Sequence, residues 1–319
     1  MYDVVALGEM LIDFTPVGVS ANHNPIFERN PGGAPSNMLC MLAKLGCSAG
    51  FIGKVGNDPF GHALKQTLDD NGVSSQGMVL SDEYQTTLAF VHLSETGDRS
   101  FSFYRNHTAD VMLSPEEVNR GMIDDCRIFH FGSVSMTAEP SRSATFAAAE
   151  YAREKGKLIS YDPNLRLNLW ESAALAKEWI LKGVAYANIL KLSEEELVFL
   201  TGCTDFKQGA QELLDRYENL KVVLISLGGD GALALNRECT VSMTAYPVKV
   251  ADTTAAGDSF MGGFLYKMLH ASASPESLSQ QELLDCLSFA NATGSMTTTR
   301  KGSIHALPTM EEILGLMNS

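Results

Sequence analysis

Residues 252–260, DTTAAGDSF, place three small residues, Ala255, Ala256 and Gly257, directly before a carboxylate at Asp258. Apolar residues follow at helical spacing, so the small residues lie where a loop enters a helix. The first N–H groups of a helix have no partner inside it and the dipole makes that end positive, so this junction can bind an anion. A carboxylate beside an anion site suits phosphoryl transfer, in which backbone donors hold the phosphoryl charge and an aspartate takes the proton of the attacking hydroxyl.

Two other interpretations of this stretch stay open on the sequence alone. Asp and Thr are common helix caps, so Asp258 could simply cap the following helix. Ser259, in the triplet GDS, could be a hydrolase nucleophile, although no GxSxG turn surrounds it. The groups that Asp258 and Ser259 contact decide between these interpretations.

A second candidate group lies near the N-terminus, in the segment NPGGAPSNM. Gly32 and Gly33 would let the backbone approach a ligand closely, and the Asn37 side chain offers both donors and an acceptor. A Gly-rich turn before a helix is the alternative. Together with the 252–258 stretch, the segment favours a ligand site.

Two further Gly-rich segments fail the tests for phosphate loops. Residues 56–63, GNDPFGHA, have the glycine spacing of a P-loop but carry His-Ala in place of Lys-Ser/Thr. Residues 229–234, GDGALA, follow a strand, but the residues after them read as strands, whereas a dinucleotide fold requires a helix there.

Composition excludes several classes of protein. The 319 residues include 45% hydrophobic and 19% charged residues, as in a soluble globular protein, and carry a net charge of −14 without a basic cluster, which argues against nucleic-acid binding. No apolar run reaches the roughly 20 residues of a membrane span. The first residues read as a strand, not a signal peptide, so we expect a cytoplasmic protein. Six scattered cysteines without a CxxC pair indicate reduced thiols, not disulfides or a zinc site.

The elements that must position the candidate residues alternate between strand and helix, which predicts an α/β fold with a mostly parallel central sheet flanked by helices. We expect strands at 4–8, 51–55, 128–132, 157–162, 187–193 and 222–228, followed by short antiparallel strands at 232–236, 239–243 and 246–250. We expect helices at 35–45, within 56–72, and at 140–155, 171–185, 193–200, 207–217, 259–270, 282–295 and 309–317. No long linker divides the chain, so we expect one domain over residues 1–319.

After the first strands and helices, the sequence contains strand-like segments with no helix between them. Residues 86–93 and 99–105 read as two strands joined by a turn, SETGD, and residues 13–29, rich in Pro, Gly and Asn, can join them. These segments predict a small β lid formed by approximately residues 11–30 and 86–106.

The two motifs together resemble the ribokinase-like (pfkB) family of sugar kinases. GGAPSN, followed by Gly46 and Gly56, resembles the first family signature, and DTTAAGDSFMGGFL resembles the second. The similarity covers nearly the whole chain. Segments such as FYRNHTADVML, SYDPNLRLNLW and KLSEEELVFLTG resemble fructokinases more narrowly.

The resemblance implies a role for each matching position, and an ATP-dependent transfer to a sugar hydroxyl, most closely to D-fructose. It implies that Asp258 is the catalytic base and that Ala255, Ala256 and Gly257 form the anion hole. The implied sugar contacts are Asp13, Gly32, Gly33, Asn37, Arg105 and Arg166. The implied nucleotide contacts are Lys191, Ser226, Gly228, Gly231 and Asn291, with Glu194 helping to hold Mg²⁺ through water.

The resemblance also implies a monovalent cation loop and a dimer. Asp252, Thr254 and the backbone of Thr297, Arg300 and Gly302 match the loop, which would hold K⁺. The apolar residues of 88–93 and 101–105 would form a homodimer contact through the lid.

Alternative functions stay open. A 2-keto-3-deoxygluconate kinase would use Arg105 and Arg166 to grip a carboxylate. Another sugar or ribonucleoside kinase of the family, or a non-catalytic sugar-binding regulator, are further alternatives.

Overall fold

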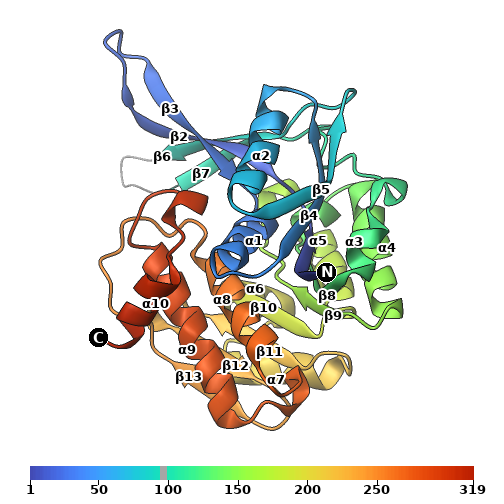
Figure 1. Ribbon diagram of the computed structural model, residues 1–319, viewed down its shortest axis with the longest axis vertical. Coiled ribbons are helices and arrows are strands. Elements are labelled where there is room, and N and C mark those ends of the chain that lie inside the picture. The colour runs from blue at the N-terminus through green and yellow to red at the C-terminus, as the bar shows by residue number, and fades with distance from the viewer. Residues whose placement is uncertain (94–98) are drawn as a thin grey trace.

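A nine-stranded sheet forms the centre of the protein in the computed structural model, which describes residues 1–93 and 99–319 (Figure 1). Its strand order is β13-β12-β11-β10-β9-β8-β1-β4-β5. In chain order the strands are β1 (Tyr2–Leu7), β4 (Ala49–Gly56), β5 (Val73–Ser81), β8 (Cys126–Phe131), β9 (Leu158–Tyr161), β10 (Ile189–Ser193), β11 (Val222–Ser226), β12 (Ala232–Leu235) and β13 (Thr240–Met243).

The sheet is parallel from β5 to β11 and antiparallel from β11 to β13, which confirms the mostly parallel sheet. One predicted strand is wrong: residues 246–250 form no regular strand. Pro247 has no N–H to donate to a ladder, which disfavours pairing beside the edge strand β13. Strand β5 was not predicted, because its residues VSSQGMVLS carry few of the apolar side chains typical of buried strands.

Helices cover both faces of the sheet (Figure 1). One face packs against α1 (Ala34–Lys44), α2 (Pro59–Asp70), α8 (Ala256–His270), α9 (Gln280–Thr297) and α10 (Met310–Met317). The other packs against α3 (Arg120–Asp124), α4 (Ser141–Glu154), α5 (Ala173–Val184), α6 (Glu194–Thr201) and α7 (Phe206–Arg216). Because side chains alternate along a strand, Val4 of β1 enters the first core and Val5 the second.

A second, smaller sheet projects from the body beside β4 and α2 (Figure 1). Its order is β3-β2-β6-β7, with β2 and β6 parallel to each other. The strands are β2 (Leu11–Val19), β3 (Pro25–Gly32), β6 (Leu88–Leu93) and β7 (Arg99–Tyr104). The predicted β layer is therefore confirmed, while the predicted SETGD turn, residues 94–98, lies outside the described residues.

The carboxyl ends of the parallel strands bring the candidate residues to one edge of the sheet. Glu9 follows β1, Asp162 follows β9, and Lys191 lies in β10. Open α/β sheets bind their ligands at this edge. The small sheet begins at the same edge, because β2 starts only three residues after Gly8.

Candidate active site

The small residues before Asp258 start helix α8. The helix begins at Ala256, three residues earlier than predicted, and Ala255 precedes it in a left-handed conformation with φ 60°. The earlier start places Ala256, Gly257 and Asp258 in the first turn; the Ala256 amide donates to the Thr253 carbonyl at 3.3 Å, while the Gly257 and Asp258 amides lack carbonyl partners further back in the helix. These amides therefore form the anion-binding end of a fifteen-residue helix.

Asp258 does not cap this helix. Its Oδ2 accepts a hydrogen bond from Asn37 Nδ2 at 2.8 Å, and its Oδ1 accepts one from Asn164 Nδ2 at 3.3 Å. Ser259 is fully buried and donates to the Ala256 carbonyl, so it cannot reach a substrate. The capping and hydrolase interpretations are therefore wrong, and the carboxylate is held by two side-chain amides.

The protonation of Asp258 reflects a balance of effects. Burial raises its pKa above the usual value, while the hydrogen bond from Asn37 and the charges of Lys191 and Arg166 act in the opposite direction. A carboxylate with a raised pKa is a better proton acceptor, provided that it stays ionised at the working pH.

Asp258 lines a cavity of about 360 Å³ between the sheet edge and the small sheet. Predicted site residues from distant parts of the chain meet there: Asp13, Gly33, Asn37, Arg166, Lys191, Thr254, Ala255 and Gly257. The cavity therefore combines the predicted base, the anion site and most of the predicted sugar contacts.

Gly32 makes room for the Asp13 side chain, and Gly33 makes room for the backbone of Glu9. A Cβ atom on Gly32 would lie 2.2 Å from Asp13 Oδ2, and one on Gly33 would lie 2.5 Å from the Glu9 carbonyl oxygen. Gly33 also has φ 126°, which side chains rarely adopt. Burial raises the pKa of Asp13 to about 6 against the opposing charge of Arg166.

Lys191 places a buried ammonium group beside the anion site. Its Nζ forms an ion pair with Asp162 at 3.0 Å, and a Cβ atom on Gly257 would lie 3.0 Å from the same Nζ. Burial works against this charge, but Asp162 and Glu196 outweigh it and raise the pKa of Lys191. The lysine therefore stays cationic next to the amides that begin α8.

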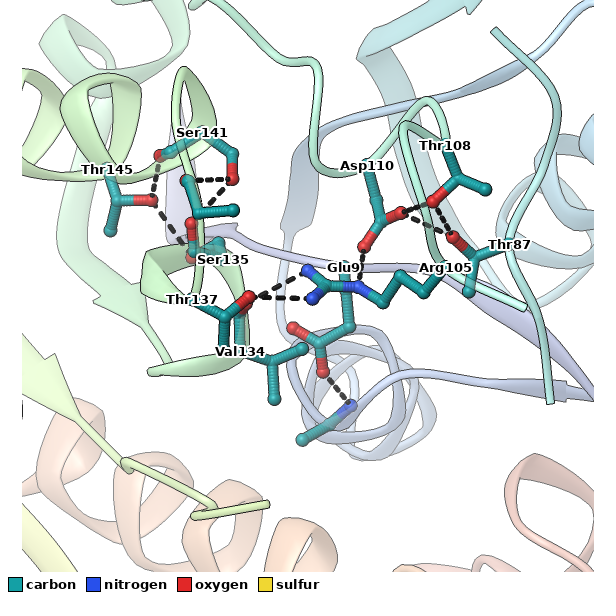
Figure 2. Close-up of polar contacts among 12 residues, drawn as sticks. Glu9, Thr87, Arg105, Thr108, Asp110, Val134, Ser135, Thr137, Ser141 and Thr145 are labelled. Atoms are coloured by element: carbon teal, nitrogen blue, oxygen red, sulfur yellow. Dashed lines mark hydrogen bonds and ion pairs between the residues drawn. The ribbon is translucent and has the colours of Figure 1, made fainter. Parts of the chain in front are cut away.

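Arg105, a predicted sugar contact, does not line this cavity, although it lies next to it. Figure 2 shows its guanidinium donating to Asp110 (2.6 Å), Thr137 (2.7 Å) and the Val134 carbonyl (2.9 Å). It does not join the described residues that line the Asp258 cavity. The guanidinium instead ties the end of β7 to the short helix after β8.

Four predicted nucleotide residues form a separate group around the β11–β13 end of the sheet. Ser226 ends β11, and Gly228 and Gly231 flank the turn into β12. Asn291 of α9 donates weakly to the Met243 carbonyl at 3.4 Å, and Gly231 packs against the same carbonyl. The fold thus brings together positions up to 65 residues apart, as a common nucleotide surface requires.

Glu194 lies in a larger cavity of about 850 Å³ that adjoins the Asp258 cavity through Asn164, Arg166 and Lys191. In residues 1–93 and 99–319, no cluster of three or more His, Cys, Asp or Glu side chains is arranged to hold a metal. A single nearby carboxylate fits Mg²⁺ only if nucleotide phosphates and water supply most of its ligands, which is how Mg²⁺ commonly binds.

The residues of the predicted cation loop lie close together. Asp252 accepts hydrogen bonds from the Thr254 amide (2.9 Å) and the Gly302 amide (3.2 Å), and its own amide donates to the Thr298 carbonyl. The side chain of Arg300 is paired with Glu312, so only its backbone could serve the loop. The two segments lie side by side, and their carbonyl oxygens are the donor type that suits a monovalent cation.

Sequence reasoning missed three residues of the site. Glu9 and Asn164 line the cavity, and Asp162 holds Lys191. Asn164 and Asp162 belong to the segment DPNLR, from which only the arginine was chosen. Glu9 precedes the first motif. Its only signal in the sequence was its position directly after the predicted strand at 4–8.

The model of the pfkB family carbohydrate kinases matches residues 1–310. A probable fructokinase, "Probable fructokinase-4" of Arabidopsis thaliana, is 44% identical over 316 residues, covering 98% of this chain and 96% of the relative. The match therefore extends over the whole architecture, not over isolated motifs.

Solved structures show the same similarity. A fructokinase with bound ATP from Xylella fastidiosa superposes with a TM-score of 0.91 at 31% identity, covering 100% of this chain and 99% of that one. A fructokinase double mutant from Vibrio cholerae O395, bound to fructose, ADP and a potassium ion, gives a TM-score of 0.87 at 33% identity, covering 99% and 98%.

Proposed function

The chain belongs to the pfkB family of carbohydrate kinases, and from that premise we propose that it transfers the γ-phosphoryl group of ATP to the 6-hydroxyl of D-fructose. The observation that carries the proposal is the placement of Asp258, between two amides and beside the first amides of α8, in a cavity rich in hydrogen-bond acceptors. Relatives named fructokinase, one of them solved with fructose and ADP, support fructose as the acceptor.

In the proposed reaction Asp258 accepts the proton of the sugar hydroxyl. The hydroxyl oxygen forms a bond to the γ-phosphorus, and the bond between that phosphorus and the β,γ-bridging oxygen breaks to release ADP. The amides of Ala256 and Gly257 and the ammonium of Lys191 hold the charge on the phosphoryl oxygens. Donors preorganised around a developing charge usually supply the largest part of catalysis.

The remaining nucleotide and ion contacts are part of the same proposal. Ser226, Gly228, Gly231 and Asn291 bind ATP, and Glu194 holds Mg²⁺ through water, so that the metal offsets phosphate charge. The loop of Asp252, Thr254, Thr297, Arg300 and Gly302 holds K⁺ behind the anion site.

The cavity favours a neutral sugar over an acidic one. Two carboxyl groups, Glu9 and Asp13, line it together with the base. Arg105, which a keto-acid kinase would use, is bound to Asp110. Arg166 remains the one predicted arginine on the cavity wall, and its charge acts on Asp13.

A substrate panel tests the proposal. With ATP and Mg²⁺, kcat/KM is measured for fructose, 2-keto-3-deoxygluconate, ribose and purine ribonucleosides. The proposal expects fructose to give the highest value. A higher value for the keto acid would reassign the substrate, and turnover of none of them would favour a sugar-binding regulator.

The proposal extends to the small sheet and to the whole chain. Residues 1–319 act as one kinase domain, in which the small sheet closes over the sugar and excludes water, so that ATP is not hydrolysed. Its exposed apolar side chains lie mainly on β2 and β3, at Val17, Val19 and Ile26, with Tyr104 of β7. In residues 88–92, the part of β6 whose burial is described, the apolar side chains are buried or half-buried, so Val17, Val19, Ile26 and Tyr104 are the ones that support a homodimer through the lid, which light scattering at high concentration tests.

The cellular place of the enzyme is a further part of the proposal, supported by its use of ATP and by its free thiols. In the part of the chain that the structure covers, no helix has the length and apolar character of a membrane span. All six cysteines are free thiols. The proposed site of action is the cytoplasm, where ATP is supplied and thiols stay reduced.

A further inference from the structure

Glu9 has an acceptor that the fold leaves without a donor. The residue follows β1 and is only 5% exposed. Its Oε1 accepts a hydrogen bond from the Ala34 amide at the start of α1, at 3.1 Å. Its Oε2 is buried and has no hydrogen-bond partner among the described residues. Buried polar atoms of this kind are rare, and each calls for an explanation.

The nearby cation does not supply that donor. Arg105 is close enough to influence Glu9, but its guanidinium donates to Asp110, Thr137 and Val134. Figure 2 shows the second carboxylate oxygen of Glu9 without a partner, turned toward Val134. Val134 and Glu9 line the same cavity as Asp258. The missing donor is therefore expected from the cavity side.

A second unpaired acceptor lies on the same wall. The amide nitrogen of Asn37 donates a hydrogen bond to Asp258. The Oδ1 atom of Asn37 is buried without a partner in the described part of the chain. The two residues that carry these orphan acceptors, Glu9 and Asn37, both line the cavity that also contains Asp13 and the catalytic base. A ligand that satisfies such a wall must bring several O–H donors and no negative charge of its own.

We propose that Glu9 is a substrate-positioning residue, whose Oε2 accepts a hydrogen bond from a hydroxyl of the neutral sugar and which rejects sugars that carry a carboxylate. This role rests on the proposed function, because it assumes that a sugar occupies the Asp258 cavity. Glu9 sets the position and the choice of the acceptor, and it takes no part in proton transfer. A site built to bind a substrate hydroxyl discriminates strongly against ligands that leave its polar group unpaired.

The experiment compares Glu9→Gln with the wild type in the full-length enzyme. Gln keeps an oxygen that can accept the hydrogen bond of the Ala34 amide. Its NH₂ group replaces Oε2, and this group cannot accept a hydrogen bond from the sugar hydroxyl. We expect KM for fructose to rise about tenfold to a hundredfold, with kcat changed less than about threefold. We also expect kcat/KM for gluconate-type sugar acids, relative to that for fructose, to rise by at least about tenfold.

A set of deoxyfructoses identifies the contact. The hydroxyl that donates a hydrogen bond to Glu9 is the one whose removal raises KM in the wild type but not in Glu9→Gln. The matched control is Glu117→Gln, which removes a carboxylate paired with Lys54 outside the cavity and leaves KM for fructose unchanged. If Glu9→Gln does not fold, Glu9→Asp applies the same test, because it withdraws the carboxylate by one methylene while keeping its charge.

Two results would overturn the inference. The first is an unchanged KM for fructose in folded Glu9→Gln. The second is that every deoxyfructose raises KM by the same factor in Glu9→Gln as in the wild type. Failure of the proposed function looks different, since the wild type itself would then not phosphorylate fructose.

Discussion

Asn37 donates to Asp258 Oδ2 at 2.8 Å, although 221 positions separate the two residues in the sequence. This hydrogen bond connects the two family motifs, GGAPSN and DTTAAGD. It aims the carboxylate into the cavity and favours its ionised form. Asn37 therefore acts directly on the proposed base.

Replacing Asn37 by Leu tests this contact. Loss of the donor removes an interaction that lowers the pKa of Asp258, so that pKa rises and the acid limb of kcat moves to higher pH. The pH profile of kcat measures the shift. The control is Asn236→Leu, which removes a buried amide bonded to the Leu278 carbonyl. An unshifted limb in Asn37→Leu would show that the contact does not control the base.

Replacing Lys191 by Met tests the charge beside the anion site. We expect kcat to fall by about 10²–10³, as for the loss of one preorganised donor. The variant also leaves Asp162 buried without its partner, which costs about 3–5 kcal/mol of stability. Steady-state kinetics and urea unfolding separate the two effects.

The double variant Lys191→Met with Asp162→Asn sharpens that test. It removes the unpaired charge, so stability returns while kcat stays low. Lys54→Met, which breaks the ion pair with Glu117 away from the cavity, is the control and keeps kcat. Recovery of kcat in the double variant would mean that Lys191 only supports the fold.

The free energy of unfolding should depend on pH through the titration of Glu9. Burial raises the pKa of Glu9 from 4.5 to about 7, against the backbone amides of Glu9 itself and of Ala34 and against the charge of Arg105. Because the folded-state pKa is raised, the contribution of this group to stability is fully present below pH 4.5 and is lost as pH rises through 7.

Glu9→Gln removes that titration. Relative to the wild type, its free energy of unfolding should rise by about 3 kcal/mol between pH 4.5 and pH 8, and then stay level. Urea unfolding at several pH values measures the difference, and other acids cancel because both proteins contain them. A difference independent of pH would contradict the buried, unpaired state of the carboxyl group.

The loop around Asp252 predicts activation by a monovalent cation. We expect activity in K⁺ to exceed that in Na⁺ or without either ion, because bound K⁺ orders the backbone behind the anion site. Asp252→Ala, which removes the acceptor of the Thr254 and Gly302 amides, should abolish the difference. Equal activity in all three conditions would remove K⁺ from the account.

Local rules predicted much of the fold. Alternating apolar segments located most strands and helices, and the small residues before Asp258 predicted the helix N-terminus. The same rules missed β5, which is weakly apolar, and assigned a strand at 246–250, because an apolar pattern does not reveal whether a partner strand is available.

Tertiary contacts set the parts of the site that the sequence could not predict. Arg105 read as a substrate arginine, but Asp110 and two other acceptors hold it, and only the fold brings them together. Asn164 reaches Asp258 because its backbone adopts φ 51°, which nothing in the sequence requires. Glu9 became a candidate only when its second oxygen proved to be unpaired.

The most direct test of the central claim compares Asp258→Asn with the wild type. Kinetics with fructose and ATP give kcat, and calorimetry gives the Kd for fructose. The account predicts a loss of about 10²–10⁴ in kcat, because the base is removed, with fructose still bound within a few-fold of the wild-type Kd. Unchanged turnover in Asp258→Asn would contradict it.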